Sequence, residues 1–143
     1  MKKIISILLL WIVLNRECNP IDLIIWKETV DSIILDRYAI QKIFTKQITK
    51  WPNGQTIQVF IKPLQSIEHK DFVTNVLGIS PFYYQQVLET QLNNNKLTSI
   101  IEIPTDKQMI MKVESTPGAI GYVNYEVITG SKTVIVVDGN KIP

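Results

Sequence analysis

The chain has 143 residues, of which 45% are hydrophobic and 20% charged, a composition typical of an ordinary globular protein. This length suits one domain with a real core and is short for a two-lobed receptor or a large enzyme. The first 18 residues hold three basic residues and one acidic residue, and the remainder holds twelve of each. A neutral body without a Lys/Arg stripe argues against nucleic acid as the main partner.

The N-terminus has the layout of an export signal. Two lysines precede the almost unbroken apolar run Ile4–Leu14. Its eleven residues match the hydrophobic region of a signal peptide and are too few to span roughly 30 Å of hydrocarbon. The following Asn15–Cys18 offers no small-x-small cleavage pattern. We therefore predict a periplasmic, exported domain over residues 20–143. Residues 1–18 are either a cleaved signal peptide or an uncleaved anchor that tethers the protein to the membrane.

The few residues suited to metal binding or nucleophilic attack limit the chemistry of the chain. Cys18 is the only cysteine and His69 the only histidine, so an internal disulfide and a thiolate or multi-histidine metal site are excluded. The sequence has no Asp-rich calcium loop and no Gly-x-Ser-x-Gly elbow. His69 lies in a segment, Ile67–Asp71, typical of the exposed first turn of a helix. We expect no cofactor, no metal and no enzymatic activity.

Apolar periodicity predicts the first elements of the chain. The apolar run Ile21–Trp26 suits a buried strand. Asp36 is a candidate N-cap, and the helix after it carries one apolar face formed by Ile40, Ile43 and Phe44. The turn Trp51-Pro-Asn-Gly54 follows, because proline forbids helix there and Asn-Gly favours a turn. A strand over 57–61 comes next, with Phe60 on the face opposite to Ile57, Val59 and Ile61.

Three helices and two strands complete the predicted order. Ser66 is a candidate N-cap for a helix that Gly78 ends. The pair Ser80-Pro81 opens the next helix, and Thr105 with Gln108 fits a capping box for the third. Strands are expected over 119–123 and 133–137. The resulting order is β-α-β-α-α-α-β-β, and the continuous apolar strands indicate an α/β or α+β fold, a small sheet covered by helices on both faces.

The most informative stretch is Thr116-Pro-Gly-Ala-Ile-Gly-Tyr-Val123. Its Pro-Gly pair ends the preceding helix, and Gly121 allows another backbone or a ligand to approach the following strand closely. Together with Ile43-Phe44 and Trp51-Pro-Asn-Gly54, the stretch resembles the phosphate-type periplasmic substrate-binding proteins of ABC transporters, within the type 2 periplasmic-binding-protein (PBP) superfamily. The resemblance covers roughly residues 35–125, about two-thirds of the chain. It implies an α/β fold with a single PBP-like lobe, a small mixed sheet flanked by helices, as in the short single-domain members.

The resemblance implies a ligand site at the start of the helix capped by Ser66. Phosphate receptors carry an Arg-x-Asp-Gly-Ser-Gly-Thr segment there, and this sequence has Lys62-Pro-Leu-Gln-Ser66-Ile-Glu-His69 instead. Ser66 corresponds to the capping serine, and Lys62 or His69 supplies positive charge. The glycine-rich nest is missing, and Glu68 puts a carboxylate where an anion would lie. We therefore expect weak oxyanion binding by Ser66, Lys62 and His69. Taken alone, these residues are also typical of a plain N-cap and of solvated surface side chains.

Two functions remain open from the sequence. The first is an exported solute-binding module that takes phosphate or a related oxyanion and works with an ABC permease or a second PBP-like chain. The alternative is a ligand-free interaction or adaptor protein of the cell envelope. Phe82 and Tyr83 lie off the apolar stripe of their helix, so at least one is expected to face solvent or a partner. Trp51 is expected to pack in the core rather than against a ligand.

Overall fold

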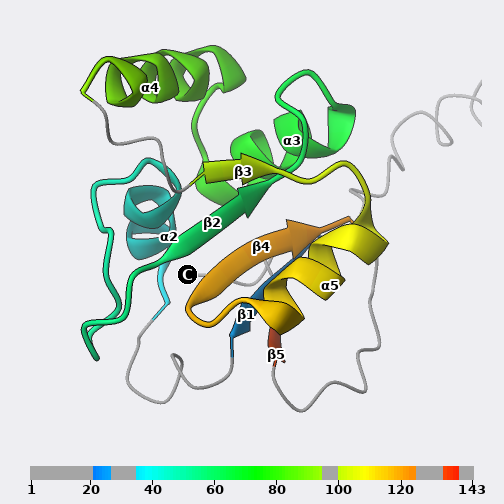
Figure 1. Ribbon diagram of the computed structural model, residues 1–143. Helices are drawn as coiled ribbons and strands as arrows, with labels where there is room; N and C mark the ends of the chain where they lie inside the picture. Colours follow the sequence, from blue (N-terminus) through cyan, green and yellow to red (C-terminus); the bar gives the residue numbers. More distant parts are fainter. Residues whose placement is uncertain (1–20, 27–34, 95–99, 125–133, 139–143) are drawn as a thin grey trace, which may run out of the picture.

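Five strands form one mixed sheet in the computed structural model, which describes residues 21–26, 35–94, 100–124 and 134–138. The strands lie in the order β3-β2-β4-β1-β5 (Figure 1). Strand β2 is parallel to both β3 and β4, whereas β1 is antiparallel to both β4 and β5. The strands are Asp22–Trp26 (β1), Gln58–Ile61 (β2), Ile100–Glu102 (β3), Ala119–Val123 (β4) and Val134–Asp138 (β5).

Helices cover both faces of this sheet. Helix α5 (Asp106–Ser115) packs on one face, where Phe60 meets Met109 and Val113 in a small core. The larger core on the other face lies between the sheet and three helical segments. These segments are α2 (Arg37–Phe44), α3 (Ile67–Asp71) with its π-helical continuation η2 (Phe72–Leu77), and α4 (Pro81–Asn93) (Figure 1). The predicted α/β fold is confirmed. None of the described helices is long and apolar enough to cross a membrane.

Alternation along β2 assigns its side chains to the two cores as predicted. Val59 and Ile61, with Ile57 just before the strand, belong to the larger core, and Phe60 belongs to the core under α5. Successive side chains of a strand point to opposite faces, so this pattern requires an apolar cover on both sides. The alternation of apolar side chains along this strand therefore indicates that helices cover both faces of the sheet.

Capping residues explain where the helices begin and end. The side chain of Asp36 accepts a hydrogen bond from the Ala39 N–H at 2.7 Å, and that of Thr105 accepts one from the Gln108 N–H at 3.2 Å. Gly78 has a φ of 71°, the left-handed conformation that favours glycine directly after a helix. These three helix boundaries confirm the sequence predictions.

Two features of the fold differ from the sequence predictions. Strand β3 was not expected, because it has three residues and Ile101 and Glu102 on it are both exposed, so no apolar pattern marks it. Gly121 does allow a close approach, but the neighbour is a side chain. A Cβ at this position would lie 2.7 Å from the sulfur of Met109 on α5. The missing side chain thus lets α5 pack tightly on β4.

Some sequence predictions fall outside the part of the chain that the structure describes. The export signal or anchor over residues 1–18 is one of them. The last predicted strand began at Thr133, which also lies outside, and β5 runs from Val134. The export signal or anchor therefore stays a prediction, whereas the last strand is confirmed from Val134 onward.

Candidate functional site

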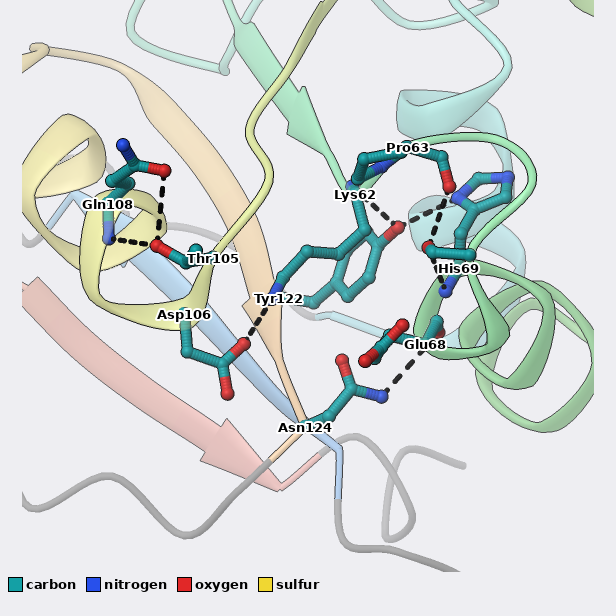
Figure 2. A network of polar contacts seen from close by, with 10 residues as sticks. Lys62, Pro63, Glu68, His69, Thr105, Asp106, Gln108, Tyr122 and Asn124 are labelled. Carbon is teal, nitrogen blue, oxygen red and sulfur yellow. Dashed lines mark hydrogen bonds and ion pairs between the residues drawn. The ribbon is translucent and has the colours of Figure 1, made fainter.

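The carboxyl ends of β2 and β4 carry a network of polar side chains. In open α/β sheets, ligands bind in the crevice outside the carboxyl ends of the strands. Here β2 ends next to Lys62, and β4 ends next to Asn124. Helices α3 and α5 both begin at this edge, as Figure 2 shows. The three residues implied by the family resemblance, Ser66, Lys62 and His69, lie together in this network.

Tyr122 on β4 is the centre of the network. Its side chain is fully buried and stacks on Phe72 of η2, with ring centroids 3.7 Å apart and planes 7° from parallel. Its hydroxyl oxygen accepts the backbone N–H of Lys62 at 2.9 Å and lies 2.7 Å from Nδ1 of His69. Burial raises the pKa of the Tyr122 phenol well above its usual value, so the phenol stays protonated. Which of the two groups donates in this hydrogen bond depends on the tautomer of the His69 ring.

His69 is buried and uncharged at neutral pH. Only 1% of the residue is exposed, so the predicted exposed helix turn was wrong for this side chain. The imidazole lies among aromatic rings, with its centroid 5.2 Å from that of Tyr84. Burial, with a smaller repulsion from Lys70, lowers the pKa of His69 to about 4. A neutral ring supplies no positive charge to an anion at pH 7.

Lys62 is also buried, with 4% of the residue exposed. The interpretation of Lys62 as a solvated surface side chain is therefore wrong. Its ammonium forms an ion pair with the carboxylate of Asp106, the first residue of α5. The Asp106 side chain is 21% exposed, so the pair lies at the boundary between core and solvent. The cation of the predicted site is thus already matched by an anion.

Ser66 caps α3 as predicted. Its hydroxyl oxygen accepts the His69 N–H at 3.2 Å and donates its proton to the Pro63 carbonyl at 2.6 Å. Both of these contacts are within the protein, and they hold the turn between β2 and α3. A ligand role for Ser66 stays a prediction.

Asn124 was missed by the sequence reasoning. The residue follows β4, is 4% exposed, and donates from Nδ2 to the Glu68 carbonyl at 3.5 Å. Its Oδ1 is buried and has no hydrogen-bond partner among the described residues. A polar residue directly after a fully apolar strand was the available signal, because a buried amide needs partners. The same argument applies to Tyr122, whose hydroxyl had to find partners inside an apolar strand.

The described residues contain no group of three or more His, Cys, Asp or Glu side chains that could hold a metal ion. The polar network offers the ammonium of Lys62 paired with Asp106, the exposed carboxylate of Glu68, the hydroxyls of Ser66 and Tyr122, and the amide of Asn124. Such an arrangement can hold a small polar or anionic group.

No known protein family and no curated protein sequence matches the chain. Among solved structures, the fold is similar to an ABC-type phosphate transport receptor from Vibrio cholerae, with a TM-score of 0.58 and 16% sequence identity. That match covers 82% of this chain and 45% of the receptor. The fold is also similar to PstS from Borrelia burgdorferi, with a TM-score of 0.52 and 15% identity over 85% of this chain and 58% of PstS.

The chain therefore has the fold of a PBP-like lobe and spans about half the length of these two proteins. The likeness supports the predicted resemblance at the level of the fold. At this level of identity, the likeness shows the fold alone.

Proposed function

We propose that this chain is an exported solute-binding-like domain that takes phosphate or a related oxyanion weakly at the carboxyl ends of β2 and β4. The observation that carries the proposal is the position of Lys62 and Ser66. Both lie where β2 ends and α3 begins, within a fold shared with phosphate receptors. Ligands of open α/β sheets bind at this edge.

The local chemistry favours a small anion but limits its affinity. The first amides of α3, at Ile67 and Glu68, have no partner within the helix, and the helix dipole adds about half a positive charge there. Against this, His69 is neutral and the Lys62 ammonium is already paired. The exposed Glu68 side chain adds a negative charge at the same turn. One lobe also cannot close around a ligand to exclude water.

A partner is the natural way to complete such a site. In this proposal, a second PBP-like chain covers the edge formed by Lys62 and Ser66, or an ABC permease receives the solute there. The export segment would place the domain in the periplasm, either free after cleavage or tethered by residues 1–18.

Calorimetric titration of the full chain with inorganic phosphate at pH 7 and low salt tests the proposal. We expect saturable heat with a dissociation constant on the order of 100 μM, about −5.5 kcal/mol. The double variant Ser66→Ala/Lys62→Ala should abolish the heat. The matched control is Lys70→Ala, which removes an exposed lysine from the same helix and should bind as the wild type does. The absence of heat up to millimolar phosphate would contradict the proposal.

A ligand-free interaction domain is the second candidate, favoured by the surface of α4. Phe82 and Tyr83 are 72% and 52% exposed, in agreement with the prediction that at least one faces outward. Tyr83, but not Phe82, lines a hollow of about 530 Å³, together with Gln47, Gln86, Val87, Thr90 and Gln91. Exposed aromatic residues at a hollow are typical of protein interfaces.

The two candidates make different predictions for Phe82→Ser/Tyr83→Ser. An interaction domain should lose concentration-dependent association in sedimentation velocity with this variant, while its thermal stability stays unchanged. A solute-binding domain should keep its phosphate heat in the same variant.

A further inference from the structure

The pair formed by Lys62 and Asp106 joins two parts of the candidate site. Lys62 follows β2, and Asp106 is the first residue of α5, 44 positions further along the chain. The lysine is almost fully buried, whereas the aspartate side chain keeps 21% of its surface in solvent. A buried ammonium needs a close anion, because removal from water costs it several kcal/mol. Asp106 is the anion that the fold supplies.

A carboxylate and a small oxyanion present the same chemistry to an ammonium. Each offers negatively charged oxygen atoms that accept short, charge-assisted hydrogen bonds. Asp106 also lies at the start of α5, where the helix dipole favours a negative charge from either source. An oxyanion at Lys62 would therefore have to compete with the Asp106 carboxylate for the same ammonium.

A second group at this edge is buried without a full set of partners. The amide of Asn124 is turned toward the start of α3 (Figure 2), where Nδ2 reaches the Glu68 carbonyl. Its Oδ1 has no partner among the described residues, although the residue is only 4% exposed. Rotation of an amide exchanges its oxygen and its NH₂ group, so this position can accept or donate a hydrogen bond. The carboxyl end of β4 thus has an unused polar contact at the start of α3.

We propose that Asp106 is a built-in competitor of oxyanions at Lys62. Its carboxylate occupies the contact that a ligand oxygen would take, which keeps the anion affinity of the wild-type chain low. This inference rests on the proposed function, because it concerns the same site. It implies that removal of the Asp106 charge opens the site to phosphate.

The test compares the wild-type full chain with Asp106→Asn and Glu114→Gln by calorimetric titration with inorganic phosphate at pH 7. Glu114→Gln removes the same charge from the other end of α5 and controls for the change in net charge. We expect phosphate to bind Asp106→Asn at least about tenfold more tightly than the wild type. Glu114→Gln should stay within about twofold of the wild type.

The outcomes separate this inference from the proposed function. Equal phosphate affinity of Asp106→Asn and the wild type would overturn the inference and leave the proposed function standing. Binding by Asp106→Asn alone would support the inference and contradict phosphate binding by the natural chain. No binding by either protein would contradict both. A similar gain in Glu114→Gln would show that net charge, and not the contact at Lys62, sets the affinity.

Loss of its counter-ion can leave Asp106→Asn unfolded, and a second measurement covers that case. Circular dichroism of this variant is then recorded in phosphate and in chloride at equal ionic strength. Folding in phosphate but not in chloride supports the inference, because the added anion replaces the missing carboxylate. An unfolded chain in both salts overturns it.

Discussion

The two ends of β4 differ in how their contacts are made. At the amino end, the indole Nε1 of Trp51 donates to the Gly118 carbonyl at 2.8 Å. Trp51 is 3% exposed and Gly118 has a φ of 76°. The Gly118 carbonyl also accepts the Gln58 N–H at 3.2 Å, so this turn is held by one buried ring and by the backbone of the neighbouring strand. At the carboxyl end, Tyr122 joins Lys62 and His69, which come from two other parts of the chain.

The sequence motifs that resemble the receptors belong to the amino end of β4. Trp51-Pro-Asn-Gly54 and the Pro-Gly pair before β4 lie at the amino ends of the parallel strands, away from the candidate site. These motifs stabilise the fold, and they therefore support the resemblance to the receptors at the level of the fold. The residues available for a ligand lie at the opposite edge, where the sequence departs most from the receptor pattern. The motifs that stabilise the fold and the residues of the proposed binding site therefore lie at different ends of the same strand.

Trp51→Ala should have the largest effect on stability. The change removes a buried aromatic ring and one of the two hydrogen bonds to the Gly118 carbonyl, which also accepts the Gln58 N–H at 3.2 Å. We expect the free energy of unfolding to fall by about 3–5 kcal/mol in urea denaturation. Trp51→Phe keeps most of the ring and should cost about 1–2 kcal/mol. Equal losses for the two variants would mean that the hydrogen bond, and not the packing, holds the amino end.

His69 should make the carboxyl end sensitive to acid. Its pKa is about 4 in the folded protein and about 6.5 in the unfolded chain. Between these values the unfolded chain binds a proton that the folded protein does not bind. Stability should therefore be fully present above pH 6.5 and fall by about 2–3 kcal/mol as the pH decreases to 4.

Urea unfolding at a series of pH values checks this effect of His69. The control is His69→Asn, which keeps a polar side chain but cannot titrate in this range. This variant should lack most of the decrease between pH 6.5 and 5, where carboxylates contribute little. If the free energy of unfolding of this variant depends on pH as steeply as that of the wild type, groups other than His69 cause the acid sensitivity.

Tyr122→Phe should have an intermediate effect. The change removes the hydroxyl and leaves the buried Lys62 N–H and His69 Nδ1 without their partner. We expect a loss of about 2 kcal/mol in the free energy of unfolding. The matched control is Tyr84→Phe, which removes one hydroxyl that donates to the Phe44 carbonyl at 3.0 Å and should cost about 1 kcal/mol. A smaller loss for Tyr122→Phe than for Tyr84→Phe would argue against a central role for Tyr122.

Ser66→Ala should have the smallest effect on stability, about 1 kcal/mol, because it removes one helix cap. Thermal unfolding followed by circular dichroism measures it. Ser66→Asp keeps a capping oxygen and should recover stability. The same variant should weaken phosphate binding, since it adds a negative charge at the start of α3.

The sequence predicted the fold wherever a signal was local. Asp36 and Thr105 as caps, Gly78 after η2 and the alternation along β2 each depend on a few neighbouring residues. Strand β3 was missed because this segment forms a strand through its pairing with β2, and its own sequence has no alternating pattern. Short strands of this kind are defined by their neighbours in space.

The candidate site was predictable only in part, because its contacts join distant residues. Ser66 was assigned as a cap from its position, and the structure agrees. The burial of His69 and Lys62 depends on Tyr122 and Asp106, which lie 53 and 44 positions further along the chain. Nothing in the charged segment around His69 indicated an aromatic pocket. The resemblance grouped the three residues at the start of one helix, and the packing then buried His69 in its neutral form and paired Lys62 with Asp106.

The most direct test of the account is a phosphate titration of the ¹⁵N-labelled chain followed by two-dimensional NMR, because it observes both ends of β4 at once. The account predicts amide shift changes at the carboxyl end, in Lys62 and in Ser66–His69, and none at Trp51 or Gly118. Changes confined to the amino end, or no changes at millimolar phosphate, would contradict it.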